Sequence, residues 1–162
     1  MIEIRPIAID DAASFREALD AVCRERRYLH SLAAPPLEKA REFIGKNIEK
    51  DHAQFVAVEQ DKIVGWCDIT PGSQGEAHVG KLGMGVLKSH RGQGLGRKLL
   101  EATLAKTRRQ AFEKIELSVY SSNAPGLALY RKMGFVEEGV RKRARLVDGI
   151  YDDIILMALF LR

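Results

Sequence analysis

The segment Arg91-Gly92-Gln93-Gly94-Leu95-Gly96-Arg97 combines three glycines with two cationic side chains. It follows an apolar run, Leu82–Leu87, that predicts a strand, and it opens a stretch of helical periodicity from about Leu95 to Phe112. The first N–H groups of a helix have no internal partner and carry partial positive charge, so they bind anions. Glycines let a ligand approach the main chain closely. The segment therefore predicts a site for a phosphate-bearing cofactor or substrate.

Three ligand-binding interpretations of this glycine turn compete with an ordinary turn that binds nothing. A P-loop needs a hydroxyl residue behind its last glycine, and residues 97–99 contain none, which excludes it. A dinucleotide fingerprint needs G-x-G-x-x-G in the first strand–helix unit. Here the spacing is G-x-G-x-G and lies past the middle of the chain, although Glu113 and Glu116 fall near the expected acidic position. The third interpretation takes the pattern R-x-x-G-x-G as a whole.

That pattern, Arg91-x-x-Gly94-x-Gly96, resembles the pyrophosphate loop of the GNAT superfamily of acetyl-CoA-dependent N-acetyltransferases. A second segment, Asn123–Phe135, has the sequence NAPGLALYRKMGF and closely resembles the N-x-x-[AG]-x-x-[LF]-Y-x-K-x-G-F segment of the same family. The two motifs occur in family order and at the family separation. The resemblance covers about Val56 to Phe160.

The resemblance implies an α/β (α+β) fold with a mixed sheet, one domain over residues 1–162, and the element order β-α-α-β-β-β-α-β-α-β-β. It implies acetyl-CoA as cosubstrate, no metal, and transfer of the acetyl group by direct attack of a primary amine on the thioester. The acceptor would be a small amine, an amino acid or a protein α-amino group. The alternatives are transfer from a longer acyl-CoA, for which the space around Leu82 and Met84 matters, and a non-catalytic acyl-CoA-binding protein.

The resemblance also assigns residues. Asn123 would hold the cofactor arm, and Tyr130 would lie beside the thioester sulfur. The expected cofactor-binding residues are Met84, Gly85, Val86, Arg91, Gly92, Gln93, Gly94, Leu95, Gly96, Arg97, Asn123 and Tyr130.

Amide formation from a thioester requires a donor for the developing oxyanion, and each such donor contributes about 3–4 kcal/mol. We expect a backbone N–H of the strand Met84–Val86, along which the pantetheine arm would pair as an added strand. Gly83 and Gly85 are costly in an ordinary strand and indicate either a close approach or a bulge. Tyr130 suits the general acid, because a phenol pKa of about 10 lies close to a thiol pKa of about 8.5. A core tyrosine would give the same pattern.

The general base is less evident. Some family members carry a glutamate five residues before the asparagine, and that position is Ser118 here; Glu116 lies two residues away on the same strand face. His78, in phase with Met84 on its strand, titrates near neutrality and is the catalytic candidate, with a structural histidine as the alternative. Because the sequence shows no strong general base, an α-amino acceptor is favoured. Its pKa of about 7.7–8.0 leaves a good fraction of the amine neutral, whereas a lysine amine, with a pKa of about 10.4, is almost wholly charged.

The acceptor pocket should lie between the segment Arg24–Ala34 and the final hairpin, with Tyr28, His30 and Tyr151 as substrate candidates. The tail at residues 147–153 is similar to that of GNAT members that act on protein N-termini, amino acids and related small amines.

Hydrophobic periodicity and turn residues predict the elements that position these groups. A helix begins at a cap formed by Asp10 or Asp11. The other expected helices are Leu37–Glu49, Leu95–Phe112 and Ala124–Met133. The expected strands are Ile2–Pro6, Gln54–Glu59, Ile63–Ile69 (in a hairpin about Asp61-Lys62), Ala77–Val86, Lys114–Tyr120, Val136–Leu146 and Ile150–Leu161.

The chain of 162 residues has a net charge of +4 and the composition of a globular protein. Its basic cluster, Arg141–Arg145, lies on a predicted strand whose residues alternate between faces, so it cannot form a dense nucleic-acid-binding stripe. No apolar run reaches the length of a membrane span. Cys23 and Cys67 are expected to be buried free thiols. The expected setting is cytoplasmic, and the C-terminal strands would suit a homodimer.

Overall fold

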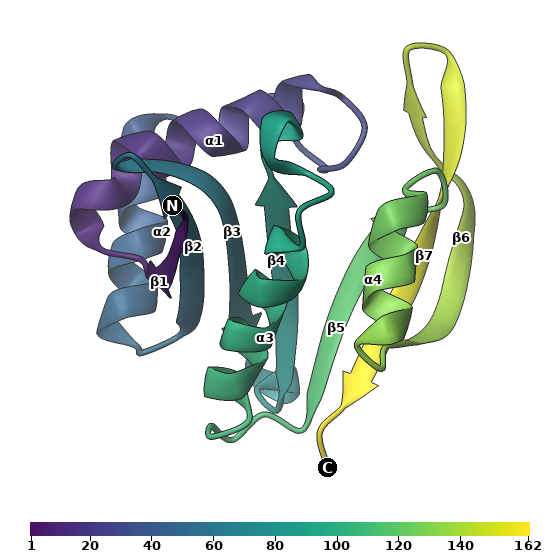
Figure 1. Ribbon diagram of the computed structural model, residues 1–162. Coiled ribbons are helices and arrows are strands. Elements are labelled where there is room, and N and C mark those ends of the chain that lie inside the picture. Colours follow the sequence, from purple (N-terminus) through teal and green to yellow (C-terminus); the bar gives the residue numbers. More distant parts are fainter.

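The structure, a computed structural model, describes all 162 residues. Its elements are β1 (Glu3–Pro6), α1 (Ala12–Arg24), α2 (Leu37–Glu49), β2 (Ala53–Glu59), β3 (Lys62–Pro71), β4 (Val79–Val86), α3 (Leu95–Thr107), β5 (Lys114–Tyr120), α4 (Ala124–Lys132), β6 (Val136–Val147) and β7 (Ile150–Phe160), with short 3₁₀ turns at Ile9–Asp11, Gln74–Glu76 and Lys88–His90. The strands form one seven-stranded mixed sheet in the order β1-β2-β3-β4-β5-β7-β6 (Figure 1). The predicted fold class and element order are confirmed.

Helices cover both faces of the sheet (Figure 1). On one face, α1 and α2 pack on β2 and β3 through a core that includes Phe15, Ile44 and Trp66. On the other, α3 and α4 bury Leu99, Leu127 and their neighbours against β3, β5 and β7. Because successive strand residues point to opposite faces, β3 serves both cores, and most of its residues are apolar on both sides.

The sheet opens between β4 and β5, its only parallel neighbours. They pair over Val79–Lys81 and Lys114–Glu116, and from there they diverge (Figure 1). The rest of β4 therefore has no strand on that edge, as the predicted splay requires.

Several boundaries differ from prediction by one or two residues, and one differs by five. The helix α3 ends at Thr107 instead of near Phe112, and residues 108–111 form turns. The hydroxyl of Thr107 donates to the carbonyl of Thr103, 2.8 Å away, a bond that weakens a helix interior. The chain then turns so that Phe112 enters the core. The turn between β2 and β3 uses Gln60 and Asp61, both with left-handed φ, one residue earlier than expected.

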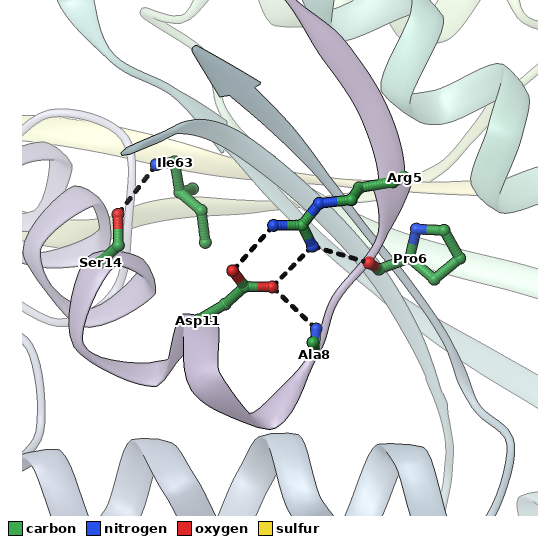
Figure 2. A network of polar contacts seen from close by, with 6 residues as sticks. All are labelled: Arg5, Pro6, Ala8, Asp11, Ser14 and Ile63. Carbon is green, nitrogen blue, oxygen red and sulfur yellow. Dashed lines mark hydrogen bonds and ion pairs between the residues drawn. The ribbon is translucent and has the colours of Figure 1, made fainter. Parts of the chain in front are cut away.

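Asp11 occupies the first position before α1, as predicted, but its carboxylate caps no α1 amide. It accepts two bonds from Arg5, at 2.7 and 2.9 Å, and one from the Ala8 N–H at 2.8 Å (Figure 2). One turn later, the Ser14 hydroxyl accepts the Ile63 N–H at 2.8 Å. These bonds attach the start of α1 to β1 and β3.

Two arginine side chains of the basic cluster on β6 make separate contacts with different aromatic rings. A register shift between Arg141 and Arg145, with left-handed φ at Arg143, interrupts the expected alternation. The guanidinium of Arg143 lies 4.1 Å from the ring centre of Tyr151, and that of Arg145 lies 4.4 Å from the ring centre of Tyr120. The cationic side chains therefore lie in separate contacts and form no continuous stripe.

Both cysteines are buried and free, as expected, and burial raises the pKa of each thiol. None of the helices has the length and apolarity that crossing a bilayer requires.

Candidate active site

A pocket of about 450 Å³ lies at the start of α3, between β4 and α4. We call it the glycine-turn pocket. It contains every residue predicted to bind the cofactor except Gln93, which is exposed. Its lining is completed by Val22, Tyr28, His90, Pro125, Gly126 and Leu129.

The glycine turn presents open main chain to this pocket. Gly92 and Gly94 have φ of 76° and 80°, in the left-handed region, and a Cβ on either would meet nothing within 4 Å. Gly94 precedes α3, and no side chain caps the helix. The first amides of α3, from Leu95 onward, are thus free to bind an anion. Gly96 serves another purpose, since a Cβ there would lie 3.3 Å from Leu129 and separate α3 from α4.

Arg91 is not the free cation that its position suggested. Its Nε donates to the Val86 carbonyl at 2.9 Å, and its two terminal nitrogens donate to the Glu25 carboxylate at 2.8 and 2.6 Å. Its guanidinium also lies 4.6 Å from the ring centre of Tyr28. Glu25 neutralises this charge, so Arg91 joins the end of α1 to the end of β4. The flanking Arg97 is exposed and pairs with Glu101.

The free edge of β4 carries main-chain donors. The Leu87 N–H donates to the Val64 carbonyl of β3 at 2.9 Å, and main-chain groups alternate between the two edges of a strand. The N–H groups of Met84 and Val86 therefore face the opening toward β5, whereas that of Gly85 faces β3. Of the three expected oxyanion donors, Met84 and Val86 have the required orientation.

Packing explains Gly85. A Cβ at this position would lie 2.5 Å from the indole ring of Trp66, its partner on β3. The register between β3 and β4 is continuous from Gly65 to Pro71, so the bulge considered for Gly83 and Gly85 does not occur.

Asn123 and Tyr130 reach the pocket from the two ends of α4. The Asn123 Oδ1 accepts the Gly126 N–H at 3.0 Å and caps the helix, while its Nδ2 makes no bond within the chain. Tyr130 is 9% exposed and packs edge-on against Phe135, with ring centres 5.8 Å apart. Burial raises the pKa of the Tyr130 phenol. The phenol is protonated at neutral pH, but the raised pKa places it further from the thiol pKa than an ordinary tyrosine.

The structure does not bring His78 to this pocket. The residue is exposed and precedes β4, at the end where β4 and β5 are still paired. Six strand positions separate it from Met84, a span of about 20 Å. Glu116 is also unsuited to accept a proton, because hydrogen bonds from Lys81 and Lys114 lower the pKa of its carboxyl.

A second pocket, of about 440 Å³, lies in the opening between β4 and β5; we call it the inter-strand pocket. It contains His30, the Lys81–Glu116 pair and residues of the final hairpin, including Arg141. A pocket therefore lies where the acceptor was predicted to bind, but of the three candidate residues only His30 lines it, and the His30 Nδ1 lies 3.1 Å from the Tyr120 hydroxyl. Tyr28 lines the glycine-turn pocket, and Tyr151 is 51% exposed on the hairpin.

A third pocket, of about 390 Å³, lies between α1, α2 and the strands β3 and β4, and contains Asp68. We call it the α1–α2 pocket. Asp68 is 8% exposed, makes no hydrogen bond or ion pair within the chain, and has its pKa raised to about 7 by burial. Asp68 was not among the residues predicted to form a site. The signal was present, because Asp68 is the only charged residue in the apolar run Ile63–Ile69.

Comparison with known proteins agrees with this geometry. A model of the acetyltransferase (GNAT) family matches residues 16–135. The chain belongs to the GNAT family. It is 28% identical over 165 residues to the uncharacterized N-acetyltransferase YokL, derived from the SPbeta prophage of Bacillus subtilis, covering 98% of this chain and 89% of that protein.

Solved GNAT structures share the fold. An acetyltransferase of the GNAT family from Streptococcus pneumoniae superposes with a TM-score of 0.91 at 26% identity, over 99% of both chains. The Salmonella typhimurium yncA structure, which holds acetyl-CoA, superposes with a TM-score of 0.92 at 20% identity, over 99% of this chain and 94% of that one.

Proposed function

We propose that this GNAT protein transfers the acetyl group of acetyl-CoA to the amino group of a primary amine. One observation carries the proposal: an uncapped helix start, an unpaired strand edge and a buried tyrosine line the same pocket. The amides of Leu95 and Gly96 would hold the diphosphate. The Nδ2 of Asn123 and the free edge of β4 would hold the pantetheine arm by hydrogen bonds. The acetyl-CoA in the yncA structure supports this choice of cosubstrate.

Bound acetyl-CoA would supply the acetyl thioester, and the residues of the chain would supply the rest of the chemistry. The N–H groups of Met84 and Val86 are placed to stabilise negative charge on the carbonyl oxygen, worth about 3–4 kcal/mol per donor. The Tyr130 phenol would donate its proton to the departing sulfur. Such positioned proton transfer contributes about 10²–10⁴-fold in rate.

The experiment combines binding with turnover. Acetyl-CoA at a hundred times its Kd should stabilise the fold by about 2.7 kcal/mol in a thermal-unfolding assay, and a panel of primary amines should release free thiol. The Tyr130→Phe variant should bind acetyl-CoA with the same affinity as the wild type. Its rate of thiol release should be lower by about 10²-fold or more. An unchanged melting temperature with acetyl-CoA would refute the proposal. Unchanged turnover in Tyr130→Phe would remove the role assigned to that residue.

We further propose a cytoplasmic homodimer that binds neither nucleic acid nor metal. Support for the dimer comes from β6, an edge strand with the exposed apolar residues Val136, Val140 and Leu146, a type of surface that pairs with another chain. Light scattering in solution would test it, and a monomeric mass at micromolar concentration would exclude this arrangement.

A further inference from the structure

We propose that Asp68 receives the amino group of the acceptor and takes its proton, and that the acceptor is a primary amine attached to an apolar group. The inference rests on the proposed acetyl transfer. It begins with a carboxylate that has nine-tenths of its surface buried, faces a pocket, and has no partner in the chain. Buried carboxylates are normally paired. An unpaired one that lines a cavity indicates a partner that arrives from outside.

The walls of the α1–α2 pocket suit an organic ammonium ion. Phe15 meets the ring of Trp66 edge-on at 5.8 Å and stacks with Phe43 at 6.5 Å between ring centres. Leu29 and Pro35 add to the apolar lining of the pocket. Aromatic faces attract cations, and the attraction is stronger when the cation is also desolvated. A carboxylate among aromatic and apolar side chains therefore favours an ammonium group that carries an apolar substituent.

The position of Asp68 connects this pocket with the proposed acetyl site. Met84 lines both the α1–α2 pocket and the glycine-turn pocket. Asp68 pairs in register with Gly83, the residue before Met84, and a Cβ on Gly83 would lie 3.4 Å from the Asp68 Oδ1. The absence of that side chain leaves the carboxylate uncovered next to the Met84 main chain. An amine held by Asp68 would thus approach the strand edge whose N–H groups face the expected carbonyl.

Three other titratable groups line this pocket, and they are less suitable as bases. Cys23 faces it from α1 with a thiol pKa raised by burial. Lys39 lines it from α2 and pairs with Glu42 on the surface. His30 lines it from the segment between the two helices and contacts the Tyr120 hydroxyl. The strand β4 contributes no titratable group, since Gly83 and Met84 are its only residues that line the pocket.

Two protons leave the acceptor nitrogen during the reaction. The acceptor enters as an ammonium ion and passes one proton to Asp68, which releases it to solvent after turnover. The neutral nitrogen attacks the carbonyl carbon, so that an N–C bond forms and the C–S bond breaks. The second proton leaves the nitrogen as the amide forms, and it replaces the proton that Tyr130 gives to the sulfur.

The test is the pH dependence of kcat/KM for thiol release by Asp68→Asn. In the wild type, activity should rise with pH and level off above about pH 7, where most of Asp68 is ionised. The variant should bind acetyl-CoA unchanged and be slower by about 10²-fold or more at pH 7. Its activity should continue to rise toward the pKa of the free amine, because only amine already neutral in solution can react. Formate should restore part of the activity of Asp68→Ala.

Asp11→Asn is the matched control, since Asp11 is also a carboxylate on the α1 side but lies outside all three pockets. Its pH profile should equal that of the wild type. An Asp68→Asn profile identical to that of the wild type would overturn the proposal, and so would loss of the acidic limb in His30→Gln but not in Asp68→Asn. If the wild type itself neither binds acetyl-CoA nor releases thiol, it is the proposed function that fails.

The acceptor class is tested by comparing apolar with polar primary amines. We expect 2-phenylethylamine and isoamylamine to exceed ethanolamine and glycine in kcat/KM by about 10-fold or more, the usual effect of one or two methylene groups in an apolar pocket. Equal rates, or a preference for the polar amines, would exclude the apolar acceptor.

Discussion

Two carboxylates on the α1 side of the sheet have opposite environments. Asp11 accepts bonds from Arg5 and from the Ala8 N–H (Figure 2), and the Arg5 hydrogen bond lowers the pKa of its carboxyl. Asp68 has no partner, and burial raises the pKa of its carboxyl to about 7. The first arrangement stabilises the fold, whereas the second costs stability. A buried charge that the fold does not need is a candidate for function.

The largest expected effect is on the free energy of unfolding of Asp68→Asn as a function of pH. Because the folded-state pKa of Asp68 lies above its usual 3.8, ionisation of this group destabilises the fold. The penalty is absent below about pH 4 and complete above about pH 7, where it amounts to about 4 kcal/mol. Denaturant unfolding should therefore show Asp68→Asn gaining stability over the wild type as the pH rises.

This prediction separates a functional carboxylate from a structural one. A structural Asp68 would make the variant less stable than the wild type at pH 8. If the difference between the two proteins is constant from pH 4 to pH 8, Asp68 does not titrate in this range and the contrast with Asp11 disappears.

The second effect concerns the wall of the α1–α2 pocket. In Gly85→Ala the new methyl group would overlap the Trp66 ring, 2.5 Å away, and such overpacking costs about 1–3 kcal/mol. Because Trp66 lines the same pocket as Asp68, the KM for the acceptor should rise more than the KM for acetyl-CoA. Thermal unfolding and the two KM values would show it. An Ala variant of normal stability would mean that the glycine serves ligand approach and not packing.

The third effect tests the paired carboxylate. Asp11→Ala removes the charged partner of Arg5 and the acceptor of the Ala8 N–H, at a cost of about 2 kcal/mol. The sign with pH is opposite to that for Asp68. Since the pKa of Asp11 is lowered in the fold, its contribution is present above its usual pKa of 3.8 and is lost as the pH falls further. Denaturant unfolding at pH 7 and pH 3 should show a large and then a small difference from the wild type.

Sequence patterns predicted the helices, strands and glycine turn because these depend on local rules, whereas the mixed sheet was implied by the resemblance to the GNAT family. Periodicity, turn residues and helix starts are properties of short segments, so α2 and the element order were predicted correctly. The charge on Arg91 was misjudged because its partner, Glu25, lies 66 residues away. The distance of His78 from the pocket depends on where β4 and β5 separate, which strand parity does not specify.

Asp68 was missed for a related reason. A single aspartate in an apolar strand is visible in the sequence, but whether it finds a partner depends on helices that pack over the strand from elsewhere in the chain. In this protein α1 and α2 supply aromatic and apolar side chains opposite it and no cation bonded to it. Asp68 is notable because the tertiary structure gives its carboxylate no partner, and this cannot be read from the strand sequence alone.

The smallest expected effect is that of Ser14→Ala, which tests how far the paired region of Figure 2 extends. The Ser14 hydroxyl accepts the N–H of Ile63, a residue 3% exposed at the start of β3. Removal leaves that donor without a partner and should cost about 1 kcal/mol. In contrast to Asp68→Asn and Asp11→Ala, the loss should not vary between pH 4 and pH 8, because neither group titrates. A loss that depends on pH would show that Ser14 is coupled to Asp11, so that the bonds in Figure 2 act as one unit and not as separate contacts.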